Sequence, residues 1–309
     1  MPNKTTKFFS TEHGKKILSE YKDVLQSGRV YKSIKRHIVF VCGGEIGPSS
    51  NFRKDFLNFA NDNPPDYHFF LAEKAYKSLM QINDDVSHNL ALFERTICEI
   101  SDCILIFPES VGSYCEVGYF AHKSDIIKKI LIVNNVDHHA AGSFINEGPI
   151  ALINKETKFS STIVLEKNAP NFNLVTNRLN EKLKVAERRK SFVVEEAAQL
   201  LLQDQLFIIN EIINIFGPCS LLSIEEILRN LSIKYKRLEL QQIIAILEGS
   251  GLVHYNETYT DYLVSDCEHT DFIEYDGETR KEIRLKVLQY YQSNELKPYE
   301  VFEDEGEEL

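Results

Sequence analysis

The sequence predicts an α/β protein, and three observations lead to that prediction. Short apolar runs alternate with segments of helical periodicity between residues 37 and 168. One run, residues 103–107, continues through a turn rich in Ser and Gly into a segment whose apolar residues suit one side of a helix. Beyond residue 168 the pattern is mostly helical. Because strands that alternate with helices form parallel sheets under right-handed crossovers, we expect a five-stranded parallel Rossmann-like sheet followed by a mostly helical C-terminal domain.

Apolar runs with little alternation are typical of strands buried on both faces of a sheet. The five expected strands are residues 37–42, 67–72, 103–107, 130–134 and 162–165. The helical patterns between them lie at residues 52–60, 87–100, 114–123 and about 143–154. A further helical pattern at 11–27 precedes the sheet and ends at Gly28, a residue type that is common at helix C-termini.

The C-terminal part has the element order of a winged helix, which is helix, helix and hairpin. Its helical and hairpin segments are residues 172–190, 192–216, 223–231, 238–247, 252–255 and 259–264. A winged helix usually reads DNA with its second helix. Residues 218–268, however, include eight acidic and only four basic residues. A DNA-reading module normally carries a basic face. Contact with protein and contact with nucleic acid therefore both stay open.

These patterns divide the chain into five expected parts. They are a basic helical N-terminal arm (1–36), the α/β domain (37–168), connecting helices (169–216), a winged-helix-like domain (217–300) and an acidic, disordered tail (301–309). The arm has nine Lys and Arg against three acidic residues, so it either contacts nucleic acid or is a solvated, partly mobile terminus. The tail has five carboxylates in its last eight residues.

Charge and composition exclude several classes of function. The formal net charge of −11 argues against a protein that coats nucleic acid. No apolar run reaches the ~18 residues that span a bilayer, and no signal peptide follows the N-terminal lysines, so we expect a cytoplasmic protein without membrane contact. The six cysteines are scattered without a Cys-x-x-Cys pair, which predicts reduced, mostly buried thiols. The sequence implies no metal and no cofactor.

Two glycine-containing turns follow predicted strands at the edge where open α/β sheets bind ligands. Gly43 and Gly44 end the first strand and let a ligand approach the backbone closely, although such pairs often only make a turn. The turn Ser110-x-Gly112-Ser113 follows the third strand. Its backbone amides and the helix behind it suit a phosphate or an oxygen-rich sugar.

Glu116 comes directly after the second turn and has two interpretations. Ser113-x-x-Glu116 has the spacing of a capping box, which stabilises a helix by about 1 kcal/mol. Gly118 costs about 1 kcal/mol against Ala in the same helix, which suggests that something packs closely there. In the second interpretation, the Glu116 carboxylate attacks the anomeric carbon of a sugar and forms a glycosyl-enzyme ester.

Such a reaction also needs a leaving group that can depart. A nucleobase must be protonated by a second acid, and Glu45, Glu109 and Asp102 are nearby. Asp102 lies at the start of its strand, away from the ligand edge, so Glu109 is the better candidate, with a surface loop position as its alternative. Nicotinamide leaves a pyridinium as a neutral molecule. A site with one carboxylate is therefore easier to reconcile with NAD than with a purine nucleoside.

Residues 112–118 resemble the signature of nucleoside 2-deoxyribosyltransferases, which is Gly-Ser/Thr-x-x-Glu-Leu/Ile-Gly. The segment here is GSYCEVG, and the resemblance implies that Glu116 is the nucleophile. That family often has an Asp-Ser-Gly arrangement shortly before the signature. Here the corresponding segment is ESVG, residues 109–112, with a Glu and one extra residue.

Three motifs together resemble the effector proteins of certain bacterial retrons. They are FVCGG at 40–44, FPESVGS at 107–113 and SFINEGP at 143–149. Those effectors join a deoxyribosyltransferase-like domain to a winged-helix domain. The resemblance implies anti-phage defence, a reverse transcriptase and its RNA–DNA hybrid product as controlling partners, homo-oligomeric or filament-like assembly, and cleavage of NAD as substrate.

The predicted catalytic residues are therefore Glu116 and Glu109. The predicted substrate-binding residues are Gly43, Gly44, Ser110, Gly112, Ser113 and Asn146. Asn146 follows the fourth strand and has the alternative of capping the turn at Gly148-Pro149. Two other classes of function stay open. One is a non-catalytic nucleotide sensor that signals through its C-terminal domain, and the other is a winged-helix DNA-binding regulator.

Overall fold

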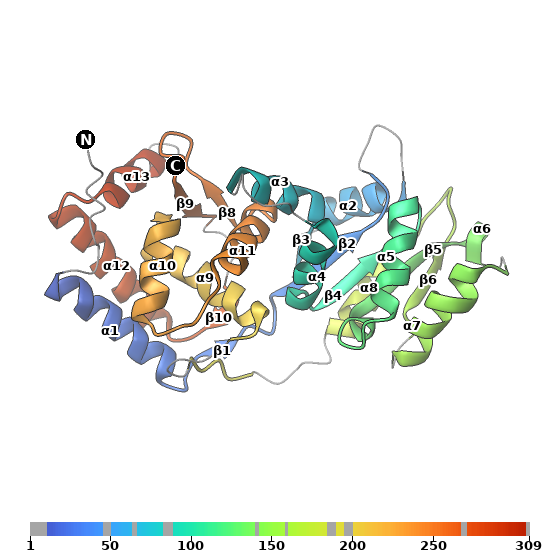
Figure 1. The fold of residues 1–309 in the computed structure, drawn as a ribbon, viewed down its shortest axis with the longest axis horizontal. Coiled ribbons are helices and arrows are strands. Elements are labelled where there is room, and N and C mark those ends of the chain that lie inside the picture. The colour runs from blue at the N-terminus through green and yellow to red at the C-terminus, as the bar shows by residue number, and fades with distance from the viewer. Residues whose placement is uncertain are drawn as a thin grey trace. The chain divides into compact units, whose positions relative to one another are not determined.

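The computed structural model divides the chain into two compact units (Figure 1). It describes residues 11–45, 51–63, 67–82, 89–139, 142–157, 160–183, 190–194, 200–266 and 271–306. The α/β unit comprises Ile34–Lys77 and Asp85–Glu187, and the helical unit comprises Met1–Ser33, Ser78–Asp84 and Arg188–Leu309. This division places the predicted N-terminal arm with the C-terminal part of the chain. It also divides the predicted connecting segment 169–216 between the two units.

The α/β unit contains the predicted five-stranded parallel sheet. Its strands are β2 (His37–Cys42), β3 (Tyr67–Phe70), β4 (Cys103–Ile106), β5 (Ile130–Asn135) and β6 (Thr162–Leu165). Every neighbouring pair is parallel, in the order β3-β2-β4-β5-β6. The chain thus winds outward in one direction from β2 and in the other from β4. In doubly wound sheets this reversal opens a crevice at the carboxyl ends of the two central strands.

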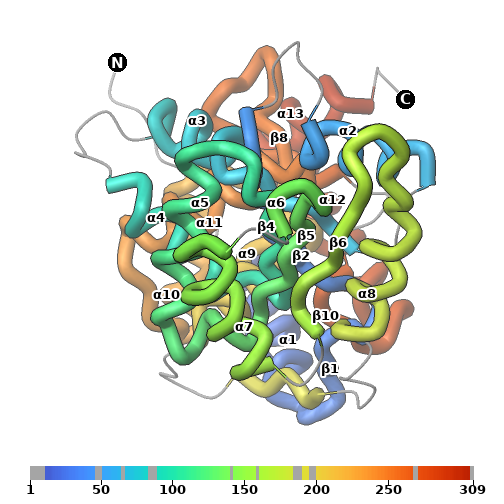
Figure 2. Tube along the Cα trace, turned by 90° about the vertical axis from the view of Figure 1, so that its right-hand side faces the viewer, coloured from blue at the N-terminus to red at the C-terminus, as the bar shows by residue number. Residues whose placement is uncertain are grey.

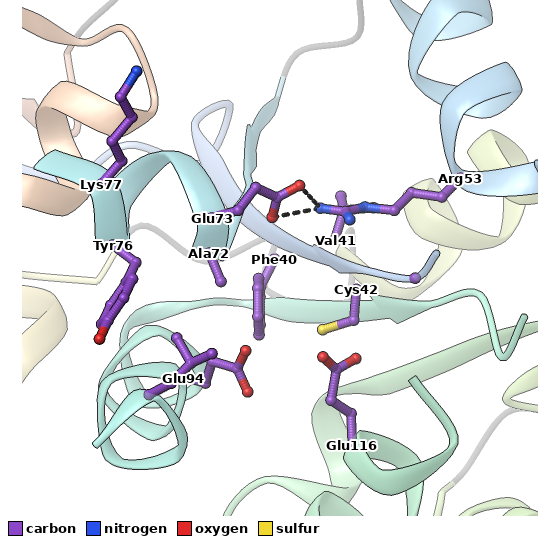
Figure 3. A pocket seen from close by; sticks show the side chains of 12 residues that line it. Phe40, Val41, Cys42, Arg53, Ala72, Glu73, Tyr76, Lys77, Glu94 and Glu116 are labelled. Atoms are coloured by element: carbon purple, nitrogen blue, oxygen red, sulfur yellow. Dashed lines mark hydrogen bonds and ion pairs between the residues drawn. The ribbon is translucent and has the colours of Figure 1, made fainter. Parts of the chain in front are cut away.

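Helices cover both faces of the sheet. They are α2 (Phe52–Asp62), α4 (Leu90–Ile100), α5 (Val111–Ala121), α6 (Val136–His139), α7 (Ala151–Glu156) with a preceding π-helix (Asn146–Ile150), and α8 (Asn173–Leu183). Val39 and Val41 belong to a buried cluster with Phe56 of α2 and Leu179 of α8. Figure 2 shows α8 on one side of the strands and α5 and α7 on the other. Because side chains alternate along a strand, Phe40 and Cys42 point to the opposite face, toward α4 and α5 (Figure 3).

One helix of this region was not anticipated. The second strand was expected to run to residue 72, but β3 ends at Phe70 and α3 (Ala72–Ile82) begins two residues later. Leu71 and Ala72 are both buried, so their apolar character is equally consistent with the end of a strand. No Gly, Pro or Asn separates the two elements, and this absence of turn residues concealed the helix.

The helical unit contains the expected element order. Its helices are α1 (Glu12–Gln26), α9 (Leu202–Phe216), α10 (Leu221–Asn230), α11 (Arg237–Gly249), α12 (Gly277–Ser293) and α13 (Lys297–Gly306). Its strands are β1 (Tyr31–Lys32), β7 (Cys219–Ser220), β8 (Val253–Tyr255), β9 (Tyr262–Ser265) and β10 (Ile273–Glu274). The predicted hairpin is present as the antiparallel pair β8 and β9, to which β7 adds a third strand. The name winged helix stays a prediction.

Three expectations for this unit are corrected. The helix expected over residues 11–27 is confirmed as α1, but it is packed and not mobile, because Tyr21 and Leu25 are buried. The helical pattern expected from residue 192 starts only at Leu202. Residues 301–306 belong to α13 and are not disordered, while residues 307–309 lie outside the described residues.

The acidic end of α13 is ordered because its carboxylates have partners. The Asn256 amide donates to Asp304 Oδ2 at 3.0 Å and to Glu305 Oε1 at 2.8 Å. Val301 is fully buried. Composition alone could not show these partners, because Asn256 lies more than 40 residues away in the sequence. In the described part of the chain, no helix is both long and apolar enough to cross a membrane.

Candidate active site

A cavity of about 220 Å³ lies beside the carboxyl end of β2 (Figure 3). It is next to the point between β2 and β4 from which the chain adds strands in opposite directions. Residues of β2 and of helices α2 to α5 line it. They are Phe40, Val41, Cys42, Gly43, Arg53, Ala72, Glu73, Tyr76, Lys77, Leu90, Glu94 and Glu116. Of the eight residues predicted for the site, only Glu116 and Gly43 are among them.

Glu116 points from α5 into this cavity, toward Cys42 and Glu94 (Figure 3). Its Oε2 atom is buried and has no hydrogen-bond partner among the described residues. Burial raises the pKa of Glu116, and the Arg53 guanidinium and a hydrogen bond from the Cys42 thiol oppose that rise. Glu116 thus presents a carboxylate oxygen to the cavity that nothing else in the described chain engages.

The capping interpretation of Glu116 is wrong. Helix α5 begins at Val111, three residues earlier than expected, and its N-cap is Ser110. Ser110 Oγ accepts the Ser113 amide at 3.1 Å, and Ser113 Oγ accepts the Ser110 amide at 2.9 Å. These two serines complete the capping box themselves. Glu116 therefore lies on the second turn, where its carboxylate has no capping role.

Glu94 of α4 is a second carboxylate in the same cavity. Burial raises its pKa to about 7, and the negative charges of Glu116 and Glu73 add to this rise against the opposing charge of Arg53. A carboxyl group with such a pKa is partly protonated at neutral pH. The sequence does contain a signal for Glu94. Leu90 and Ile97 flank it at helical spacing, which places Glu94 on the apolar side of its helix.

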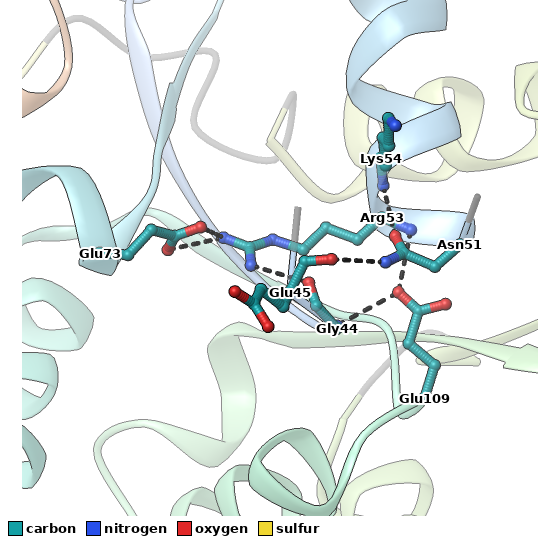
Figure 4. Close-up of polar contacts among 7 residues, drawn as sticks. All are labelled: Gly44, Glu45, Asn51, Arg53, Lys54, Glu73 and Glu109. Carbon is teal, nitrogen blue, oxygen red and sulfur yellow. Dashed lines mark hydrogen bonds and ion pairs between the residues drawn. The ribbon is translucent and has the colours of Figure 1, made fainter. Parts of the chain in front are cut away.

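Arg53 and Lys77 are the cations in the lining of the cavity, and the Arg53 side chain is almost fully buried (Figure 4). Its Nη2 donates to both oxygens of Glu73, at 2.6 and 2.8 Å, and its Nη1 donates to the Gly44 carbonyl at 3.1 Å. These charge-assisted bonds, together with the bond to the Gly44 carbonyl, fix the position of the guanidinium. Neither Arg53 nor Glu73 was predicted, although Glu73 follows a predicted strand at the ligand-binding edge.

The two glycines make room for protein side chains. A Cβ atom on Gly43 would lie 2.7 Å from Arg53 Cδ, and one on Gly44 would lie 3.2 Å from Glu109 Cγ. Only Gly43 lines the cavity. The Gly43-Gly44 turn thus admits Arg53 and Glu109 close to the backbone, where the sequence predicted a ligand.

Glu109 holds the β2 turn and the start of α2 together (Figure 4). Its Oε2 accepts the Phe52 amide at 2.8 Å, and its Oε1 accepts the amides of Arg53 and Gly44 at 3.1 and 3.3 Å. A carboxylate at a helix N-terminus is favoured by the free amides and by the helix dipole. Glu109 lines a different cavity from Glu116. The structure does not bring the two predicted catalytic residues into one cavity.

Comparison with known proteins gives the family of the chain. A family model described as STM3845 retron effector protein matches residues 49–255. The chain belongs to this retron effector family. The matched segment includes most of the α/β unit and continues into the helical unit, so the family covers parts of both.

Two Escherichia coli proteins are similar to this retron effector. The one named "Retron Ec73 putative ribosyltransferase/DNA-binding protein" is 36% identical over 127 residues, which are 40% of each chain. The one named "Retron Ec86 putative ribosyltransferase/DNA-binding protein" is 30% identical over 127 residues, 41% of this chain and 39% of the relative. The chain thus spans about two fifths of the length of the curated relatives that it matches.

The predicted Ser110-x-Gly112-Ser113 turn of the retron effector has a structural role. Ser113 is buried, and its hydroxyl also accepts the Glu109 amide at 3.0 Å. The two serine hydroxyls are therefore occupied by the start of α5. None of these three turn residues lines the cavity of Glu116.

Asn146 of the retron effector lies in the π-helix before α7. Its amide donates to the His138 carbonyl at 2.7 Å, and its Oδ1 accepts from Asn134 at 3.3 Å. It lines a separate cavity of about 230 Å³. These contacts connect the π-helix to α6 and to the end of β5. They do not bring Asn146 into the cavity of Glu116.

The prediction of reduced, mostly buried thiols is confirmed for the cysteines that the structure describes. Cys42, Cys98, Cys103 and Cys219 are buried and free, and Cys115 is exposed and free. Cys267 lies outside the described residues. Cys42 is the thiol of the candidate site, and burial raises its pKa well above the usual range. It therefore acts there as a hydrogen-bond donor to Glu116 and not as a thiolate.

Proposed function

We propose that this retron effector cleaves the N-glycosidic bond of NAD or a related nucleotide, with Glu116 as the nucleophile. One observation carries the proposal. The Oε2 atom of Glu116, which is buried and has no hydrogen-bond partner among the described residues, lies in a cavity with the second carboxylate Glu94. Two carboxyl groups with different environments are the usual equipment for cleaving a glycosidic bond. The word ribosyltransferase in the names of both relatives supports the same chemistry.

In the first step, a Glu116 oxygen attacks the anomeric carbon of the ribose. A C–O bond forms, the bond from that carbon to the base nitrogen breaks, and the bonding electron pair leaves with the base. Water then attacks the same carbon and releases Glu116 as a carboxylate. Poor solvation leaves Glu116 Oε2 free for attack, and the nearby charge of Arg53 favours the ionised form that attack requires.

Glu94 takes the role of second carboxylate that the sequence assigned to Glu109. With a pKa of about 7, it can donate a proton to a departing base and then accept one from the incoming water. Glu109 is poorly placed for this, because both of its oxygens already accept backbone amides.

The charge of the cavity favours a cationic base. The charge of Arg53 is paired with that of Glu73, and the ammonium of Lys77 is directed away from Glu94 and Glu116 (Figure 3). Glu116 as a carboxylate and Glu94 in its ionised fraction are therefore the negative charges that a substrate meets in the cavity. A nicotinamide ring is cationic while attached to ribose, so these negative charges attract it. We therefore place NAD first among the nucleotides that this cavity suits.

The partners form part of the same proposal. We place the effector under the control of a retron reverse transcriptase and its RNA–DNA product, in a homo-oligomer or filament. The word DNA-binding in the names of the relatives supports a nucleic-acid contact. Cleavage measured with and without these partners tests the control.

The deciding experiment compares wild type with Glu116→Gln by chromatography of the products formed from NAD, with the effector alone and with its retron partners. We expect nicotinamide release from wild type and a loss of at least ~10³-fold in the variant, because Gln is a far weaker nucleophile than a carboxylate. Thermal melting of both proteins controls for folding.

Two other results would change the assignment. Cleavage of a nucleoside or deoxynucleotide without any cleavage of NAD would make the effector a nucleoside transferase or hydrolase. Tight nucleotide binding without turnover of any substrate would favour the non-catalytic sensor.

A further inference from the structure

A second cavity, of about 370 Å³, lies at the carboxyl ends of β4, β5 and β6. It is larger than the cavity of Glu116, and the reaction proposed above does not use it. Its lining residues are Asn51, Phe52, Asp55, Phe107, Pro108, Glu109, Tyr114, Val133, Asn135, His138, Lys167 and Asn168. They come from the start of α2, from α5, α6 and β5, and from the segments that follow β4 and β6.

The two cavities are neighbours. Phe52 lines the second cavity and Arg53, the next residue, lines the first. On α5, Tyr114 lines the second cavity and Glu116, two residues later, lines the first. Consecutive Cα atoms are about 3.8 Å apart. Less than one helical turn of α2 and of α5 therefore separates the cavities on each side.

The size of the first cavity limits what it can hold. Sites for drug-sized ligands are about 300–1,000 Å³, so 220 Å³ suits a base with its ribose better than a whole dinucleotide. The second cavity, at 370 Å³, falls within that range. A substrate with two nucleoside halves needs both.

The chemistry of the second cavity suits a nucleoside monophosphate. Phe52, which is 7% exposed, offers a small apolar contact for a flat ring, whereas Phe107 is fully buried. The Asn135 side-chain NH2 offers donors for the edge of a base, while its oxygen accepts the Asp137 amide, and the phenol of Tyr114 offers a donor and an acceptor. Lys167 is exposed on the segment after β6 and supplies a positive charge for a phosphate, while Asp55 and Glu109 of the same lining are acidic and favour its placement at the Lys167 end.

We propose that the second cavity binds the other nucleotide half of a dinucleotide substrate, while the bond to be cleaved lies at Glu116. This proposal rests on the proposed function and adds the substrate class to it. Binding energy from the distant half then helps to position the reacting ribose. A mononucleotide with the same glycosidic bond is consequently a poorer substrate.

The kinetic test compares NAD with nicotinamide mononucleotide, which carries only the reacting half. It uses the complete retron complex with wild type, Tyr114→Ala and Lys167→Ala. We expect each variant to raise KM for NAD by about tenfold and to leave KM for the mononucleotide unchanged. Lys155→Ala is the matched control, because Lys155 is exposed and lines neither cavity. Equal effects on both substrates, or none on NAD, would overturn the proposal.

A binding measurement separates this proposal from the proposed reaction. Calorimetry with adenosine monophosphate is carried out on wild type, Glu116→Gln and Lys167→Ala. We expect equal affinity for wild type and Glu116→Gln and about tenfold weaker binding to Lys167→Ala, whether or not NAD is cleaved. Lys167 is exposed, so its variant keeps the fold. Absence of binding to wild type at millimolar concentration, or unchanged binding to Lys167→Ala, contradicts the second site.

Discussion

At the scale of single residues, the candidate site consists of two glutamates in one cavity with different surroundings. Glu116 has a buried oxygen without a partner in the described chain, and a thiol and a guanidinium favour its charged form. Glu94 lies among negative charges and has a pKa of about 7. When their environments give two carboxyl groups different pKa values in this way, one suits the role of nucleophile and the other the role of acid.

Glu94→Gln tests that assignment through the pH dependence of cleavage. Glu94 is mostly protonated below pH 7, so for a substrate whose base needs a proton kcat should fall as pH rises through about 7. In the variant this limb should vanish, and kcat should drop by about 10²-fold for a substrate whose base needs a proton and by less for NAD. Glu99→Gln on the same helix, outside the cavity, is the control. A variant that keeps the wild-type profile would exclude Glu94 as the acid.

The same variant has an expected effect on stability. The pKa of Glu94 is raised in the folded state, so between the lower unfolded pKa and about 7 the folded chain keeps a proton that the unfolded chain has released. Ionising Glu94 in the folded state costs free energy, and the contribution of Glu94 to stability is therefore lost as pH rises toward and through 7. Because Glu94 is partly solvated, we expect Glu94→Gln to gain only about 1 kcal/mol at pH 8, with little change at pH 4. Urea unfolding of wild type and variant at the two pH values measures this difference.

At the scale of elements, the start of α2 is the part that the site depends on. Glu109 accepts its first two amides, and the Asn51 side chain accepts the Lys54 amide at 2.8 Å. This anchoring fixes the backbone of Arg53, whose side chain then passes over Gly43 to Glu73. A helix terminus and a glycine thereby place the cation beside the two acids.

Glu109→Gln distinguishes this anchoring role from the catalytic role that the sequence suggested. An amide oxygen accepts fewer and weaker bonds than a carboxylate, so we expect a loss of about 1–3 kcal/mol in the free energy of unfolding. Nicotinamide release should stay within about tenfold of wild type below the melting temperature. Differential scanning calorimetry and the product assay measure the two effects. A fall in release comparable with that of Glu116→Gln, in a folded protein, would restore Glu109 as a catalytic residue.

At the scale of the whole molecule, the distribution of charge is uneven. Residues 1–36 carry an excess of positive charge on a protein of net charge −11. Lys15 and Lys16 are exposed on the packed helix α1, whose three acidic residues balance its three lysines, so the excess comes from residues on either side of this helix in the sequence. A local excess of positive charge can attract a nucleic-acid backbone.

Neutralising Lys15, Lys16, Lys35 and Arg36 together tests whether residues 1–36 contact nucleic acid. We expect weaker binding of the retron RNA–DNA product, with the slope of log K against log salt concentration reduced by about 0.7–0.9 for each phosphate that the variant no longer neutralises. Fluorescence anisotropy over a salt series measures both. A variant with Lys123, Lys128 and Lys155 neutralised is the control. Unchanged affinity in the first variant would exclude residues 1–36 as the nucleic-acid binding surface.

Local patterns in the sequence determined most elements of the fold. Apolar runs located all five strands to within two residues, because burial on both faces requires such runs wherever the strand is placed. Glu116 was predicted as the nucleophile because the residues of its motif are consecutive in the sequence. The start of α5 was missed by three residues, because Ser110 and Ser113 both have the composition of a helix cap and only the folded helix selects one.

The tertiary structure decided which groups share a cavity. Arg53 and Glu73 are 20 residues apart, and Glu109 is 57 residues from the Phe52 amide that it accepts. The sheet order brings these segments to one edge, and burial then shifts the pKa of Glu94. Sequence by itself determined the strands and the nucleophile candidate, since both depend on neighbouring residues. The partner of the nucleophile and the role of Glu109 depend on distant residues meeting, which only the folded chain achieves.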